Sequence, residues 1–299
     1  MPGRLISING TRIFVDERGD PAAPALLYIH GGPGQSCYDF MRTQGDLLAE
    51  RLRVIGVDQR GTLRSDPLPA VPPLSADLLV DDFETLRRRL RIESWAILGH
   101  SSGGSYALRY VTGHLDTVRS VIFDCPCWDA DLTDRNLLPV VARMLEDLGQ
   151  LADAERCREL AARSSRLTFS DGTRQAMQTL GTHYLDHFFH DPDGAGIFAD
   201  LVEGSGFTQE QWQRGNSHWP LAAALYEPAL SQLHRVRRPA VLLRGRDDLV
   251  TAPGMLRCFA ESVPDGQITT FEKSGHFAYL EEPAAYCAAV TEFVLAHAG

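Results

Sequence analysis

The stretch Trp95-Ala96-Ile97-Leu98-Gly99-His100-Ser101-Ser102-Gly103-Gly104-Ser105-Tyr106-Ala107 decides the fold of this 299-residue chain. Apolar residues run into Gly-His-Ser-Ser-Gly and helix-forming residues follow, so the pattern predicts a strand, a sharp turn and a helix. The helix must pass close to the strand, which requires small residues two positions either side of the serine, and Gly99 and Gly103 occupy them. Such a turn strains the serine backbone and pushes its hydroxyl out of the sheet. Ser101 is therefore a candidate nucleophile; the alternative is a glycine-rich turn without chemistry.

Composition and charge limit the partners. With 44% hydrophobic and 23% charged residues, the chain has the composition of an ordinary globular protein, and its length fits one large α/β domain with an insertion. The formal net charge of −10 disfavours binding to nucleic acid or to an anionic membrane surface. The first ten residues lack the apolar core of a signal peptide, and no run approaches the roughly 20 apolar residues of a membrane span. We therefore expect a cytoplasmic protein.

The cysteines indicate neither a disulfide framework nor a metal site. No Cys-x-x-Cys pair occurs among the six. They are Cys37, Cys125, Cys127, Cys157, Cys258 and Cys287. The spacing of Cys125-Pro126-Cys127 suits neither zinc nor redox chemistry well. We expect free thiols in a reducing compartment, no metal and no cofactor.

Short apolar strands alternate with helices on both sides of the opening stretch. A hairpin over residues 4–8 and 11–16 is indicated by Asn9-Gly10 between two alternating segments. Further strands are predicted over residues 25–29, 53–57, 118–123, 240–243 and 267–271. Helices are predicted over residues 41–52, 75–90, 253–261 and 283–297, and a proline-rich loop over residues 67–73. This alternation predicts an α/β fold with a mostly parallel central sheet and helices on both faces.

The alternation stops at Pro126 and resumes near residue 236. Helices are predicted over residues 137–151, 153–164, 173–189 and 209–230, with a glycine-rich loop after residue 189 and no strand. We therefore expect a core domain of residues 1–125 and 236–299 and a helical cap domain of residues 126–235. Many aromatic and histidine residues between 183 and 226 suggest that the cap forms an aromatic-lined cavity over the sheet.

Three residues follow the chain order of a Ser–Asp–His triad. A serine hydroxyl needs a neutral imidazole to take its proton and a carboxylate to orient that imidazole. Ser101, Asp248 and His276 all follow predicted strands, and ligands of parallel sheets gather at those ends. Asp247 competes with Asp248 for the role of the acid. We favour Asp248 because the loop must turn back before its side chain can face His276.

Two backbone N–H groups are candidates for binding the oxyanion of a tetrahedral intermediate. One belongs to Ser102, at the start of the helix after the turn. The other is expected from His30-Gly31-Gly32-Pro33-Gly34, where glycines allow the main chain to approach a substrate. Gly32 is our choice because Pro33 has no N–H to donate.

These motifs together resemble the α/β-hydrolase fold and, within it, the prolyl aminopeptidase (proline iminopeptidase) family. The resemblance covers residues 1–125 and 236–299. It rests on the motifs at residues 30–34, 58–61, 99–104, 245–248 and 275–277. It implies a serine hydrolase that cleaves a small amide or ester, most simply an N-terminal proline or other small residue of a small molecule or short peptide.

The chain departs from the family pattern at three points. Ser102 stands where a tryptophan usually follows the nucleophile, and Leu63 replaces a glycine in the motif that begins Asp-Gln-Arg-Gly. Relatives that cleave N-terminal residues bind the substrate ammonium with acidic residues of the cap. Glu203, at the end of an apolar helical stretch, is the first candidate for that role, and Glu227 is the second.

Two other functions remain open. A tailoring hydrolase, lyase or cyclase of small-molecule biosynthesis would use the same triad on an ester, lactone, thioester or C–C bond. A non-catalytic ligand receptor on a hydrolase scaffold is disfavoured by a triad in the correct order. The sequence makes no prediction of oligomeric state.

Overall fold

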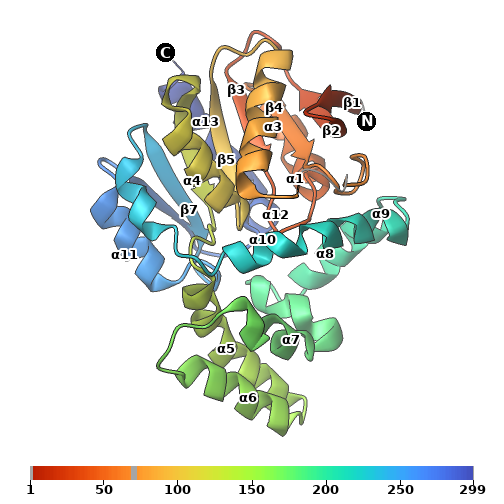
Figure 1. The fold of residues 1–299 in the computed structure, drawn as a ribbon, viewed down its shortest axis with the longest axis vertical. Coiled ribbons are helices and arrows are strands. Elements are labelled where there is room, and N and C mark those ends of the chain that lie inside the picture. Colours follow the sequence, from red (N-terminus) through yellow and green to blue (C-terminus); the bar gives the residue numbers. More distant parts are fainter. Residues whose placement is uncertain (1–2, 69–72, 299) are drawn as a thin grey trace.

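A mostly parallel sheet of eight strands forms the centre of the molecule (Figure 1). The computed structural model describes residues 3–68 and 73–298, so residues 69–72 of the predicted proline-rich loop lie outside it. The strand order is β1-β2-β4-β3-β5-β6-β7-β8; β2 pairs antiparallel with β1 and β4, and all other pairs are parallel. The strands are β1 (Gly3–Ile8), β2 (Thr11–Arg18), β3 (Ala25–Ile29), β4 (Arg53–Asp58), β5 (Trp95–His100), β6 (Val118–Asp124), β7 (Ala240–Gly245) and β8 (Gln267–Phe271). The predicted fold class is confirmed.

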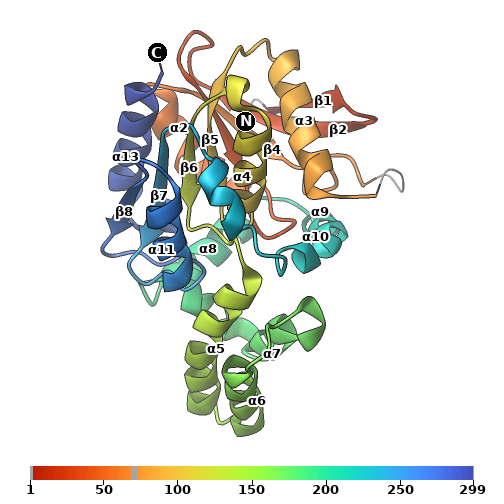
Figure 2. The ribbon, with the colours of Figure 1, turned by 60° about the vertical axis from the view of Figure 1, so that its left-hand side comes forward.

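Helices cover both faces of the sheet because successive strand residues point into two different apolar clusters. Leu27 and Ile97 face the cluster that contains α3 (Ala76–Arg89), α4 (Gly103–Gly113) and α11 (Pro253–Ser262). Leu26 and Leu98 face the cluster that contains α1 (Tyr38–Thr43), α2 (Gly45–Ala49), α12 (Ala278–Glu281) and α13 (Pro283–Ala296). In Figure 2, α13 and α3 lie on opposite sides of the strands.

The helix predicted over residues 75–90 is confirmed as α3, whereas the single helix predicted over residues 41–52 is wrong. The side chain of Ser75 caps α3 by accepting a hydrogen bond from the N–H of Leu78 at 3.1 Å. The helix predicted over residues 41–52 is instead two short helices, α1 and α2, that meet at Gln44. The Gln44 side chain is buried and donates to the carbonyl of Tyr279 at 2.8 Å, which ties this break to α12.

The part of the chain between β6 and β7 is helical, with no strand in the residues that the structure describes. We call residues 130–235 the helical segment. It contains α5 (Ala130–Asp147), α6 (Leu151–Ala162), η2 (Phe169–Asp171), α7 (Thr173–Gln178), η3 (Gly181–Phe188), α8 (Gly194–Glu203), α9 (Gln209–Gln213), η4 (Arg214–His218), α10 (Trp219–Ala224) and η5 (Leu230–Arg235). Helices α5, α6 and α7 share an apolar cluster of their own and extend away from the sheet (Figures 1 and 2).

Helix boundaries in this segment differ from the predicted ones. The helix predicted over residues 173–189 breaks at Gly181, whose φ of 60° lies in the left-handed region. The loop predicted after residue 189 contains α8, and the helix predicted over residues 209–230 is three short pieces that end before Pro228. Of the helices in the described ranges, none is long and apolar enough to cross a membrane.

Candidate active site

Ser101 lies in the turn between β5 and α4, with the strained geometry expected from the sequence. Its φ is 55°, in the region that side chains rarely adopt. A Cβ on Gly99 would lie 2.5 Å from the carbonyl oxygen of Gly103, so only glycine allows the strand and helix to approach this closely. The N–H of Ser101 donates to the carbonyl of Asp124 at 2.9 Å, which anchors the turn to β6.

The structure brings Asp248 and His276 together. His276 Nδ1 lies 2.9 Å from Asp248 Oδ1, and both side chains are buried. Asp248 also accepts the N–H groups of Val250 and Thr251, each at 3.0 Å. Burial alone would raise the pKa of Asp248, but these hydrogen bonds outweigh it and lower the pKa below its ordinary value. Burial lowers the pKa of His276, with the Asp248 carboxylate opposing it, so the imidazole is neutral at pH 7.

Ser101 and His276 open into one cavity of about 330 Å³, which Ser102 and Gly32 also line. Most of its other lining residues belong to the helical segment and include Leu137, Met177, Phe188 and Trp212. No hydrogen bond joins Ser101 to His276 within the described residues, a common state for catalytic groups before substrate binds. The volume suits a small ligand.

The loop after β3 packs directly on the turn that carries Ser101. A Cβ on Gly31 would lie 2.6 Å from the Ser101 Cβ and 2.9 Å from the His100 carbonyl oxygen. His30 is buried and fixes this loop: its Nε2 accepts the N–H of Gln59 at 3.1 Å. Burial lowers the pKa of His30 to about 4, so it stays neutral as this acceptor requires.

A second buried polar group lies behind His276. The ring centroids of His100 and His276 are 4.6 Å apart. His100 Nδ1 lies 2.9 Å from Asp124 Oδ2, which also accepts the hydroxyl of Tyr286 at 2.9 Å. These contacts fix the ring that packs against the imidazole of His276.

One group of described side chains has the atoms of a possible metal site. The potential ligand atoms of Cys125, Asp248 and His276 lie within 4.8 Å of one another. A metal would need the thiolate of Cys125, and burial raises the pKa of that thiol well above its ordinary value. Asp248 and His276 already bond to each other. The group therefore fits a hydrogen-bonded acid–base pair better than a metal site.

Three other sequence candidates lie elsewhere. Asp247 is exposed and pairs with His190 at the surface. Glu203 and Glu227 are also exposed, and neither is among the described residues that line the cavity. An apolar helical stretch does not tell which of its faces meets the cavity, so the sequence could not place these two side chains.

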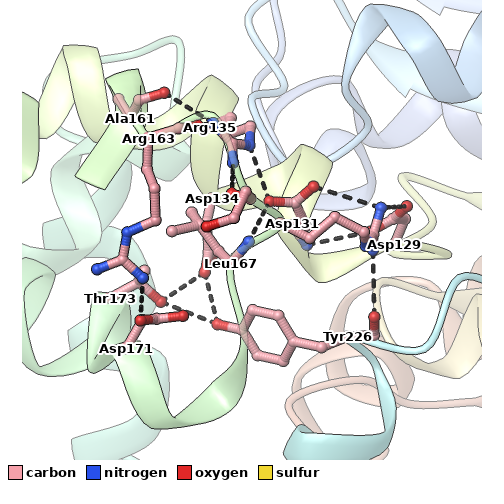
Figure 3. A network of polar contacts seen from close by, with 12 residues as sticks. Asp129, Asp131, Asp134, Arg135, Ala161, Arg163, Leu167, Asp171, Thr173 and Tyr226 are labelled. Carbon is pink, nitrogen blue, oxygen red and sulfur yellow. Dashed lines mark hydrogen bonds and ion pairs between the residues drawn. The ribbon is translucent and has the colours of Figure 1, made fainter. Parts of the chain in front are cut away.

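The acidic residue on the described cavity wall is Asp134 of α5, which no sequence pattern indicated. Asp134 is buried, and Oδ2 accepts hydrogen bonds from Thr173 and Tyr226, which Figure 3 shows turned toward it. Burial raises the pKa of Asp134 to about 6, although both hydroxyls oppose the shift. Asp134 lies one helical turn after Ala130, which also lines the cavity. The sequence of α5 alone does not tell which face of the helix meets the cavity.

Of the aromatic and histidine residues that suggested a cavity, only some reach it. Those in the described lining are Tyr184, Phe188, Trp212, Trp219 and Tyr226. Phe189 and Phe198 instead stack on Phe277, where they join the cluster beneath the sheet. The aromatic content therefore predicted the cavity wall but not which rings form it.

The backbone conformation of Leu63 explains why the family motif that begins Asp-Gln-Arg-Gly has a glycine at this position. Its φ is 31°, in the left-handed region that favours glycine, and its side chain is buried. The chain keeps the backbone conformation and adds a core side chain.

With this geometry in place, comparison with known proteins defines the class. Residues 24–283 match the family described as the alpha/beta hydrolase fold, so the chain belongs to that family and is a hydrolase. It is similar to the proline iminopeptidase of Heyndrickxia coagulans, 27% identical over 294 residues and 97% of each chain. The resemblance predicted from the motifs is confirmed.

Solved structures agree on the fold. The proline iminopeptidase-related protein from Thermus thermophilus superposes with a TM-score of 0.74 at 22% identity, covering 100% of this chain and 99% of that one. An esterase from Exiguobacterium antarcticum superposes with a TM-score of 0.69 at 20% identity, covering 98% and 99%. At these identities the likeness concerns the fold.

Proposed function

We propose that the chain is a serine hydrolase in which Ser101, His276 and Asp248 form the catalytic triad. The observation that carries this proposal is the cavity lined by both Ser101 and His276, with Asp248 bonded to the far side of the imidazole. The strained turn exposes the Ser101 hydroxyl to that cavity. Asp248 holds His276 with Nδ1 protonated, which leaves Nε2 free to accept a proton.

In the proposed reaction, Ser101 Oγ attacks the acyl carbonyl while His276 Nε2 takes its proton. The N–H groups of Gly32 and Ser102 bind the oxyanion. The bond to the leaving group then breaks, and His276 returns the proton to the departing nitrogen or oxygen. Water, deprotonated by His276, attacks the acyl-enzyme and releases the acid and free Ser101.

We further propose that the helical segment acts as a cap that selects the substrate, with boundaries near residues 126 and 235. The cavity is apolar on most of this side, and Asp134 is its acidic group among the described residues. For an aminopeptidase that cleaves N-terminal proline or another small residue, Asp134 is better placed than Glu203 or Glu227 to accept the substrate amino group. We expect the substrate to be a small molecule or short peptide.

A second candidate is a tailoring hydrolase, lyase or cyclase that acts on an ester, lactone, thioester or C–C bond. Ser102 is small where relatives carry a tryptophan, and both expected glutamates lie outside the cavity. These two observations favour a substrate without a terminal amine.

One panel of substrates tests both candidates. Wild type and Ser101→Ala are assayed on prolyl and alanyl 4-nitroanilides and on 4-nitrophenyl esters. The triad requires that Ser101→Ala lose turnover on every substrate while its circular dichroism and melting temperature stay those of wild type. Preference for the prolyl anilide supports the aminopeptidase, and activity on esters alone supports the second candidate. Full activity in Ser101→Ala would reject the mechanism.

A further inference from the structure

Among the described residues of the cavity wall, one cation lacks a hydrogen-bonding partner. Arg174 of α7 lines the same cavity as Ser101 and His276. Its guanidinium packs 4.5 Å from the ring centroid of Trp219, another lining residue. Its Nε is buried without a hydrogen bond, whereas its two Nη groups are not among the buried unpaired atoms and bond to no described residue. Nε is closed to solvent, so an acceptor supplied by a ligand in the cavity would bond to the two accessible Nη groups.

The nearby acid does not fill that role. Asp134 is the acidic residue on the described wall of the cavity, and the hydroxyls of Thr173 and Tyr226 already bond to it. Neither of its oxygens accepts a hydrogen bond from Arg174 in the described structure. The wall therefore presents a hydrogen-bonded carboxyl group and a separate guanidinium without a bond to a described residue.

A polar network fixes the connection between α6 and α7, which ends immediately before Arg174 in the sequence (Figure 3). Arg135 of α5 donates to the carbonyls of Ala161 and Arg163, at 2.9 and 2.7 Å. Asp131 accepts the N–H of Leu167 at 2.8 Å. These bonds attach the connection between α6 and α7 to helix α5. Thr173, the residue before Arg174, is itself bonded to Asp134, so the backbone that carries Arg174 is anchored at both ends of this connection.

We propose that Arg174 binds a carboxylate of the substrate, so that the enzyme acts on acyl compounds that carry a negative charge away from the scissile bond. A planar guanidinium matches a carboxylate with two parallel hydrogen bonds, and the Trp219 face holds it flat. A carboxylate fits better than a phosphate because one guanidinium balances one negative charge. This inference rests on the proposed serine hydrolase and names the substrate class of the same site.

Matched esters test it. The neutral substrate is 4-nitrophenyl butyrate. The first charged substrate is mono-4-nitrophenyl glutarate, with the carboxylate on the acyl side, and the second is 4-(butanoyloxy)benzoate, with the carboxylate on the leaving group. The kcat/KM of wild type is compared with those of Arg174→Gln, Arg174→Lys and Arg156→Gln. Arg156 is exposed on α6 and outside the described lining, so Arg156→Gln removes the same charge without touching the cavity.

We expect Arg174→Gln to lower kcat/KM for at least one charged ester by about 10- to 100-fold, the loss typical of a charge-assisted hydrogen bond. The neutral ester should change by less than about threefold, Arg174→Lys should recover part of the loss, and Arg156→Gln should match wild type. Equal charged-to-neutral ratios in wild type and Arg174→Gln for both charged esters would overturn the proposal.

The two proposals fail in different ways. If Ser101→Ala hydrolyses these esters as fast as wild type, the serine mechanism is wrong. Binding of glutarate, measured by calorimetry on wild type and Arg174→Gln, then tests the carboxylate site without turnover. Binding to wild type that weakens at least tenfold in Arg174→Gln supports the site, and equal or absent binding in both proteins contradicts it.

Discussion

At the scale of single residues, two neighbouring aspartates have opposite environments. Asp248 is buried and bonded to His276, whereas Asp247 is exposed and paired with His190. Only one of them can orient the imidazole. The sequence favoured Asp248 from the need for the loop to turn back, and the geometry supports that choice.

Replacing each aspartate by asparagine therefore gives a matched pair. Asp248→Asn keeps the shape but can hold His276 in the wrong tautomer, so kcat/KM should fall roughly 1,000- to 10,000-fold. Asp247→Asn loses one surface ion pair and should stay within about threefold of wild type. Steady-state kinetics on one ester measures both. Equal losses in the two variants would show that the acid is misassigned.

The pH dependence of the reaction follows from His276. The imidazole must be neutral to take the Ser101 proton, so kcat/KM should rise as pH increases through the His276 pKa. Burial lowers that pKa, so the midpoint should lie below the ordinary value of about 6.5. A pH profile of kcat/KM on a neutral ester measures it. A midpoint above pH 7 would contradict the proposed role, and Asp247→Asn should leave the midpoint unchanged.

At the scale of elements, the close packing of the loop after β3 on the turn after β5 is the critical contact. A Cβ at residue 31 would meet both the Ser101 Cβ and the His100 carbonyl, so Gly31→Ala must displace the turn. A displacement of this kind costs about 100-fold in rate, and we expect that loss in kcat/KM.

Gly113 provides the matched control, because nothing in the described structure lies within 4 Å of a Cβ placed there at the end of α4. Gly113→Ala should keep full activity and gain up to about 1 kcal/mol in stability. Kinetics and thermal denaturation of both variants separate the effects. Wild-type activity in Gly31→Ala would show that the loop does not position the nucleophile.

Elements with strong local signals were predictable, and those set by tertiary contacts were not. The buried strands and the capped helix α3 carry their own patterns in the sequence. The break at Gln44 depends on a hydrogen bond to Tyr279, which lies 235 residues away. The short helices of the helical segment depend on their packing, so residues 173–189 and 209–230 each read as one helix.

At the scale of the whole molecule, the chain order of Ser101, Asp248 and His276 favoured these three residues as a triad, because each follows a strand of one parallel sheet. The structure pairs Asp248 with His276 and places Ser101 and His276 on one cavity. Residues on the cavity wall had no comparable rule. Asp134 and Arg174 lie on different helices of a segment whose fold the sequence did not determine. The sequence predicted that this segment is helical, but only the structure shows which of its side chains line the cavity.

If Ser101 is an activated nucleophile, an electrophile that mimics an acyl group should modify it covalently. Wild type and Ser101→Ala are treated with a fluorophosphonate, and the modified peptide is located by mass spectrometry. We predict one adduct per wild-type chain, on Ser101, and none on Ser101→Ala. An unmodified wild-type protein, or an adduct on another residue that persists in Ser101→Ala, would show that Ser101 is not the nucleophile.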